Sequence, residues 1–123
     1  TKKIFIGSNS IKERILMGLK KTQLDHFFPE DKVFSFDMVK NPKPHPDIYL
    51  KVINSHNLNK NETVIVEDSA VGVQSGVAAG MKVFGLTAGE HWHQGRSTQE
   101  LIDAKVFSLI DSYDNLMKKI DNL

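Results

Sequence analysis

Two adjacent acids, Glu67 and Asp68, follow a strongly apolar run at residues 64–66 and precede a segment rich in Gly and Ala. Neighbouring residues of a strand point to opposite sides, so we expect only one of the two carboxylates to bind a metal ion directly. Hard carboxylate oxygens are the ligands that Mg²⁺ prefers. The alternative is that both acids merely cap the next helix, but the apolar strand that leads into them favours a metal site.

Two other polar stretches contain groups that could bind a phosphate. Ser8 and Asn9, in "GSNS", follow an expected strand, where a hydroxyl and a helix N-terminus can hold an anion, although Ser and Asn are also common helix caps. Lys43 lies in "KNPKPHPD" (40–47), whose three prolines lower the entropy cost of aiming its ammonium group. A solvated loop lysine is the alternative. Carboxylates, an ammonium and a hydroxyl together form a set that could bind Mg²⁺ and a phosphate.

Short apolar runs alternate with amphipathic stretches along the chain, which predicts an α/β fold with a doubly wound, mostly parallel sheet. In such a sheet, ligands bind beyond the carboxyl ends of the strands, so the polar stretches should meet at one edge. We expect strands at residues 3–7, 33–39, 63–68, 81–87 and 104–110, and helices at residues 10–27, 46–57, 69–80, 97–104 and 112–123.

The composition is that of a single globular domain covering residues 1–123, with 40 % apolar and 25 % charged residues. The formal net charge of +1 gives no global attraction to nucleic acid or to an anionic membrane. The absence of cysteine excludes disulfides, thiolate ligands and a cysteine nucleophile. Without a membrane-length apolar run or a signal peptide, we expect a cytoplasmic protein, and the abrupt start on "TKKIFIG" suggests that the true N-terminus lies upstream.

Three motifs, in this order, resemble those of the haloacid-dehalogenase-like (HAD) superfamily, in particular the β-phosphoglucomutase-like and sugar-phosphate phosphatase branch. They are the strand with "GSNS", "KPHPDIYL" and "VIVEDSAVGVQSGVAAGMKVFGLTAG", and the resemblance covers nearly the whole chain. It implies that Ser8 binds the transferring phosphoryl group with the backbone N–H of Asn9. Lys43 would neutralise charge on the phosphate and the nucleophile. Asp68 would be the direct Mg²⁺ ligand, and Glu67 would act through water or in support.

The chain departs from this family in one respect: it contains no Asp-x-Asp motif, whose first Asp is the family's nucleophile. The N-terminal strand that carries that motif and the cap domain are both absent, so residues 1–123 would be a partial HAD-like core. The family's sheet order places that strand between those ending at Ser8 and Asp68. Its absence should leave two inner edges open to the missing N-terminal segment or to another chain. Without an attacking carboxylate, we expect this chain alone to be inactive.

The resulting hypothesis is that the full-length protein hydrolyses a small phosphate monoester, with a sugar phosphate as the expected substrate, using Mg²⁺ and an aspartyl-phosphate intermediate. The alternatives are a phosphomutase, a non-catalytic domain that binds phosphate and Mg²⁺, and a response-regulator receiver, in which the acids would come first. His91 and His93 flank Trp92, and a contact with substrate at the site's rim is favoured there over a transition-metal site.

Overall fold

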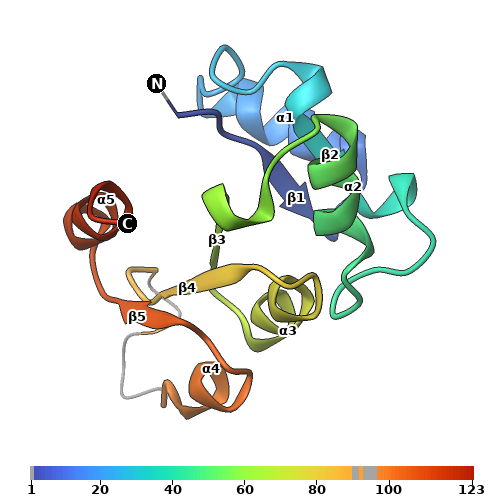
Figure 1. Ribbon diagram of the computed structural model, residues 1–123. Coiled ribbons are helices and arrows are strands. Elements are labelled where there is room, and N and C mark those ends of the chain that lie inside the picture. The colour runs from blue at the N-terminus through green and yellow to red at the C-terminus, as the bar shows by residue number, and fades with distance from the viewer. Residues whose placement is uncertain (1, 90–91, 93–96) are drawn as a thin grey trace.

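The computed structural model describes residues 2–89, 92 and 97–123, and Figure 1 shows strands and helices alternating along this part of the chain. All strand pairs are parallel, which confirms the predicted α/β class. The strands are β1 (Ile6–Ser8), β2 (Val33–Ser35), β3 (Val64–Glu67), β4 (Lys82–Leu86) and β5 (Ser108–Ile110). The α-helices are α1 (Lys12–Lys21), α2 (Asp47–Ser55), α3 (Ala70–Ala78), α4 (Gln99–Asp103) and α5 (Tyr113–Asp121). His91 and His93 lie outside the described residues.

The strands form two separate sheets. β1 pairs with β2, with Ile6 opposite Val33, whereas β3, β4 and β5 pair in that order, with Val64 opposite Lys82. Within the described residues, no backbone ladder joins β1 to β3. This division agrees with the two open inner edges that the sequence predicts.

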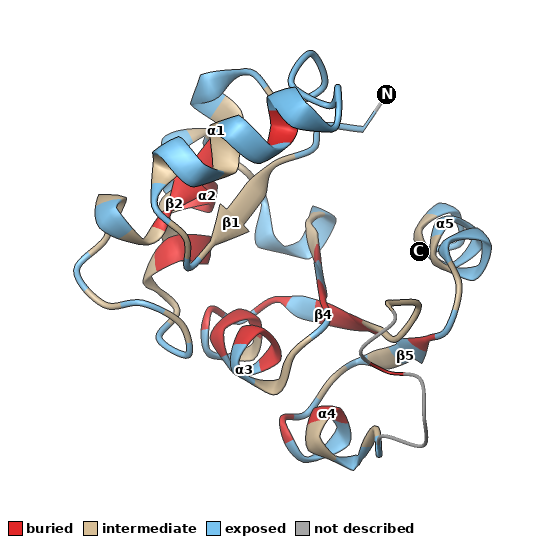
Figure 2. Ribbon diagram, turned by 180° about the vertical axis from the view of Figure 1, so that it is seen from behind, coloured by how far each residue is buried: buried red, intermediate tan, exposed pale blue. Residues whose placement is uncertain are grey.

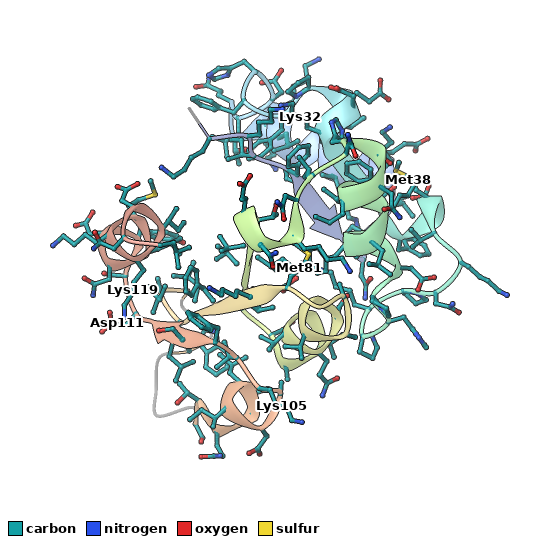
Figure 3. All side chains as sticks on the ribbon, in the orientation of Figure 1. Lys32, Met38, Met81, Lys105, Asp111 and Lys119 are labelled. Atoms are coloured by element: carbon teal, nitrogen blue, oxygen red, sulfur yellow. The ribbon has the colours of Figure 1, made fainter. Side chains whose placement is uncertain are left out.

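Each sheet is covered by the helices next to it in sequence. α1 packs on β2, and α2 packs on both β1 and β2, whereas α3 packs on β3 and β4, and α5 packs on β5. Figure 2 shows that buried residues gather on α2, α3, β2 and β4. Met81, at the start of β4, is buried near the centre of the molecule in Figure 3. α2 and α3 also contact each other, so the core continues from one sheet to the other.

The first helix is shorter than predicted, because it ends at Lys21 rather than near Phe27. The Thr22 hydroxyl donates to the Gly18 carbonyl oxygen at 2.8 Å, and Gln23 adopts a left-handed φ of 61°. The Leu24 N–H then donates back to the Leu19 carbonyl oxygen at 2.8 Å, which is a typical helix-terminating arrangement. The apolar residues beyond Lys21 had suggested a longer helix, but this local termination prevails.

Three predicted strands are also shorter than expected. β1 comprises Ile6–Ser8 instead of the expected residues 3–7. β2 stops at Ser35, whose hydroxyl donates to the Asp37 carboxylate, and a 3₁₀ turn (Phe36–Met38) replaces the rest of the expected strand. Such local bonds compete with a strand ladder. β5 comprises only the last three residues of the expected 104–110 run, because Lys105 has a left-handed φ of 70° that turns the chain after α4.

Helix α3 lies close to its sheet because Gly76 has no side chain. A Cβ at Gly76 would lie 2.5 Å from Val83 Cγ2 and 2.9 Å from Ile65 Cδ1. Gly80, with φ of 80°, ends this segment, as predicted. Among the described residues, no helix has the length and apolar character needed to cross a bilayer.

Gly76→Ala should lower the free energy of unfolding by about 1–3 kcal/mol, because the added methyl group would push α3 away from Ile65 and Val83. Gly18→Ala is the matched control: a Cβ there meets nothing within 4 Å, and replacing a glycine inside helix α1 should stabilise it by up to about 1 kcal/mol. Urea denaturation measures both changes. Equal effects of the two substitutions would contradict the close packing of α3.

Candidate active site

A groove of about 1430 Å³ runs between β1 and β3, along the two edges that lack a ladder. Because both strands belong to parallel sheets, their carboxyl ends can open onto the same region of this groove. The five residues that the sequence singled out all line it: Ser8, Asn9, Lys43, Glu67 and Asp68. The structure therefore brings the predicted phosphate-binding and metal-binding groups to one groove.

Lys43 links the ends of the two strands. Its ammonium Nζ donates to the Gly7 carbonyl oxygen in β1 at 2.9 Å and to Glu67 Oε1 in β3 at 2.5 Å. The side chains of Lys43 and Glu67 are each only 9 % exposed, so this is a buried ion pair. The prolines around Lys43 thus belong to a loop that carries the ammonium into the space between the sheets.

Glu67 points inward, as alternation along β3 requires. Its Oε1 atom also accepts a hydrogen bond from the buried Tyr49 hydroxyl. Burial first, and then the charge of Glu67, raise the pKa of Tyr49 far above its usual range, so the phenol stays protonated and acts as a donor. The carboxylate lies against the start of α3, where a Cβ at Gly72 would lie 1.9 Å from Oε2.

The Lys43 loop is fixed on two sides by hydrogen bonds. The Asn9 side chain accepts from the Lys43 backbone N–H at 3.0 Å and donates to the Lys43 carbonyl oxygen at 3.4 Å. The fully buried Ser75 hydroxyl of α3 donates to the His45 carbonyl oxygen at 2.6 Å. The family resemblance implied a role for the backbone N–H of Asn9. The Asn9 side chain has a further role, because it fixes the backbone of the Lys43 loop.

Ser8 lies at the end of β1, half-buried, and its hydroxyl accepts from the backbone N–H of Ser10 at 3.1 Å. This bond shapes the turn that leads into α1. Ser10 had been expected to begin that helix, but Ile11 occupies the N-cap without a side-chain cap bond. The Ser8 hydroxyl accepts this bond, so its own proton stays available for an anion in the groove.

Asp68 is exposed, unlike its neighbour Glu67. Its backbone carbonyl oxygen accepts a hydrogen bond from the indole N–H of Trp92 at 3.1 Å, and Trp92 is buried. The two acids therefore differ in burial, since Glu67 is buried and Asp68 is exposed. The direct role of Asp68 and the supporting role of Glu67 in binding a metal stay predictions from the sequence.

The Mg²⁺ site that the sequence predicts beside Asp68 stays a prediction. No three Asp, Glu, His or Cys side chains gather in a metal-binding arrangement within residues 2–89, 92 and 97–123. Mg²⁺ commonly keeps several waters and takes one or two protein carboxylates. Asp68 fits such a ligand in chemistry and exposure.

Sequence reasoning missed three residues that shape the site: Tyr49, Ser75 and Trp92. Tyr49 lies next to Ile48 on the apolar face of α2, and a tyrosine in a buried position usually has a partner for its hydroxyl. That signal indicates that a partner exists but cannot identify Glu67, which is 18 residues away in the sequence. Ser75 and Trp92 gave no comparable signal.

The fold is an α/β fold, in which ligands bind beyond the carboxyl ends of the parallel strands. Residues 1–86 match the family model described as "Haloacid dehalogenase-like hydrolase". This match covers more than half of the 123 residues, so the chain belongs to the haloacid dehalogenase-like hydrolase family. The family to which the sequence motifs pointed is thereby confirmed.

The relatives include two bacterial phosphatases. The chain is 34 % identical to the 6-phosphogluconate phosphatase of Escherichia coli over 70 % of its own length, and 37 % identical to the pyrophosphatase PpaX of Bacillus pumilus over 73 %. The matched parts cover 38 % and 39 % of those proteins. The chain thus corresponds to well under half of each of these relatives.

The solved structures agree on the fold. A conserved haloacid dehalogenase-like protein of unknown function from Agrobacterium tumefaciens superposes with a TM-score of 0.90 at 31 % identity, over 99 % of this chain and 55 % of that one. A putative β-phosphoglucomutase from Thermotoga maritima superposes with a TM-score of 0.82 at 27 % identity, over 95 % and 52 %. Nearly the whole chain therefore has the arrangement of about half of a larger protein.

Lys43→Met should lower the free energy of unfolding by about 3 kcal/mol, because it leaves the buried Glu67 carboxylate without its cationic partner. Adding Glu67→Gln should restore most of that loss, because the amide carries no charge and still accepts from Tyr49. Lys40→Met, at an exposed position of the same loop, is the control and should have little effect. If urea denaturation shows the same small effect for both single lysine variants, the buried pair is not what stabilises the site.

Proposed function

We propose that the whole protein of which this chain forms a part hydrolyses a small phosphate monoester, with a sugar phosphate as the substrate, through an aspartyl-phosphate. The observation that carries this proposal is Lys43, which is held between the ends of β1 and β3 beside Ser8 and Asp68 in one groove. The names of the Escherichia coli and Bacillus pumilus relatives, both phosphatases, support the same chemistry. A cytoplasmic location stays a prediction from the sequence.

The residues of this chain would bind and neutralise the transferring group. The Ser8 hydroxyl and the backbone N–H of Asn9 would hold phosphoryl oxygens at the N-terminal side of α1. The Lys43 ammonium has three N–H donors, of which two are used by Gly7 and Glu67, and the third can face the phosphoryl group. Donors fixed before the substrate arrives stabilise developing charge without reorganisation, which is the largest contribution in many enzymes.

The nucleophile would come from outside residues 1–123. An aspartate carboxylate attacks phosphorus, the P–O bond to the alcohol breaks, and the alcohol leaves with a proton from a second acid. Water then attacks phosphorus and releases inorganic phosphate and the free aspartate. The groove between β1 and β3 supports a nucleophile from another segment. It has room, along two strand edges that lack a ladder among the described residues, for the strand that carries these acids.

Mg²⁺, when bound, would neutralise charge on the nucleophile and the phosphate. Asp68 is the residue of this chain that would hold it directly, and Glu67 would support it by fixing Lys43 and by orienting water. The carboxylate chemistry and the exposure of Asp68 are the grounds for this assignment.

A phosphomutase is the second candidate. The similar Thermotoga maritima structure, described as a putative β-phosphoglucomutase, favours the phosphomutase. The two reactions share the aspartyl-phosphate and differ in whether water or a sugar hydroxyl accepts the phosphoryl group. A non-catalytic domain that keeps phosphate and Mg²⁺ affinity is the remaining alternative.

The whole protein should release inorganic phosphate from a panel of sugar phosphates in the presence of Mg²⁺. Asp68→Ala should lower kcat/KM by about 100-fold or more, because it removes a direct metal ligand. Asp114→Ala, at an exposed position of α5, is the matched control and should leave activity unchanged.

The products decide between the candidates. Release of inorganic phosphate supports hydrolysis, whereas conversion of one sugar phosphate into its isomer without phosphate release supports the phosphomutase. Mg²⁺ and phosphate binding without turnover of any substrate in the panel would favour the non-catalytic alternative. Wild-type activity in the Asp68→Ala variant would refute the assignment of that residue.

The 123-residue chain alone should be inactive, and activity should return when a separate polypeptide carrying the nucleophile strand is added. The reason is that the groove leaves the edges of β1 and β3 free for backbone hydrogen bonds, and strand addition to such edges is a common mode of association. The measurement is phosphatase activity in the mixture. A copy of that polypeptide with its nucleophilic Asp changed to Asn is the control, and activity of the 123-residue chain by itself would contradict the proposal.

A further inference from the structure

Tyr49, part of the "KPHPDIYL" motif, contacts residues of all three motifs that form the site. Its hydroxyl donates to Glu67 Oε1, and the centroid of its ring lies 5.0 Å from the Lys43 ammonium. The ring also lies against the end of β1, where a Cβ at Gly7 would come within 3.3 Å of Tyr49 Cε1. Only 8 % of the residue is exposed, so these contacts are made inside the protein rather than on its surface.

The hydroxyl and the ammonium share one acceptor atom. Both Tyr49 and Lys43 donate to Oε1 of Glu67, and the whole carboxylate lies against Gly72, where a Cβ would lie 1.9 Å from Oε2 and 2.6 Å from Oε1. Two donors bind Oε1, and the backbone of α3 at Gly72 lies close to the carboxylate, so the carboxylate is held in one orientation. Without the hydroxyl, Lys43 would be the one remaining side chain among the described contacts that donates to Oε1, and the carboxylate could turn with it.

The chemistry of Tyr49 suits this role. Its hydroxyl donates to the carboxylate, which can only accept, so the hydrogen bond has one direction. The ring also offers its face to the ammonium, which favours a cation at that point.

We propose that Tyr49 is a positioning residue, whose hydroxyl fixes the Glu67 carboxylate and thereby holds the Lys43 ammonium at the ends of β1 and β3. This inference rests on the proposed function, which assigns Lys43 to the phosphoryl group and Glu67 to the support of Mg²⁺. Tyr49 itself would touch neither the substrate nor the metal. Tyr49 lies in α2, within the "KPHPDIYL" motif, but the sequence alone assigned it no role.

The test is Tyr49→Phe in the whole protein, which removes the hydroxyl and keeps the ring. The chain's only other tyrosine, Tyr113, is 64 % exposed on α5, so Tyr113→Phe is the matched control. Tyr49→Phe should lower kcat about tenfold, the effect expected when a hydrogen bond to a charged group contributes to the transition state. It should leave KM within about twofold, because the groups that bind the rest of the substrate are untouched.

Calorimetric titration with Mg²⁺ alone gives a readout that does not depend on turnover. Tyr49→Phe should weaken Mg²⁺ binding several-fold, and Tyr113→Phe should not change it. A purely structural role would instead lower the thermal midpoint and the active fraction and leave the Mg²⁺ affinity unchanged, which would overturn the proposal. Failure of the Phe variant to fold would overturn it too, because the hydroxyl would then be needed for the fold itself.

The two proposals fail in different ways. If the wild-type protein turns over no phosphate ester, the proposed function fails, and the Mg²⁺ titration of the two tyrosine variants still decides whether Tyr49 fixes Glu67. If the wild-type protein is active and Tyr49→Phe matches it in kcat and in Mg²⁺ affinity, the positioning role is wrong while the function stands.

Discussion

The ion pair between Lys43 and Glu67 is the contact on which the rest of the site depends, because it joins two sheets that share no backbone ladder among the described residues. Lys43 also donates to Gly7 in β1, so a single ammonium links the ends of the two strands that border the groove. The Ser75–His45 hydrogen bond and the contact between α2 and α3 support the same junction. Among the described residues, the relative position of the two strand ends that border the groove is therefore set by side chains rather than by strand pairing.

A buried ion pair costs desolvation energy, and that cost is offset only when other donors and acceptors are satisfied. Here Tyr49 supplies a second donor to Glu67, and the loop that carries Lys43 is clamped by the Asn9 side chain. Among the described residues, no buried side-chain polar atom lacks a partner. The desolvation cost of the buried pair is thus offset by neighbouring residues, which donate to Glu67 and fix the loop of Lys43.

The sequence placed the polar residues of the groove better than the boundaries of helices and strands. Ser8 and Asp68 were singled out because they follow apolar runs where a parallel sheet presents its ligands, and Lys43 because prolines stiffen its loop. The end of α1 at Lys21 and the stop of β2 at Ser35 depend on a left-handed Gln23 and on a Ser–Asp hydrogen bond, which no periodicity shows. Tyr49 was missed because its partner, Glu67, is reached only through the three-dimensional fold.

The bond between the Trp92 indole and the Asp68 carbonyl oxygen has a practical consequence. Trp92 is the only tryptophan in this chain, so its emission comes from one known place, and that place adjoins the backbone of the acid assigned to the metal. The indole is buried and donates its single N–H to this carbonyl, so a shift in the turn between β3 and α3 would alter both its solvation and its hydrogen bond. The chain thus carries its own optical probe of that turn, and no label has to be attached beside the site to follow it.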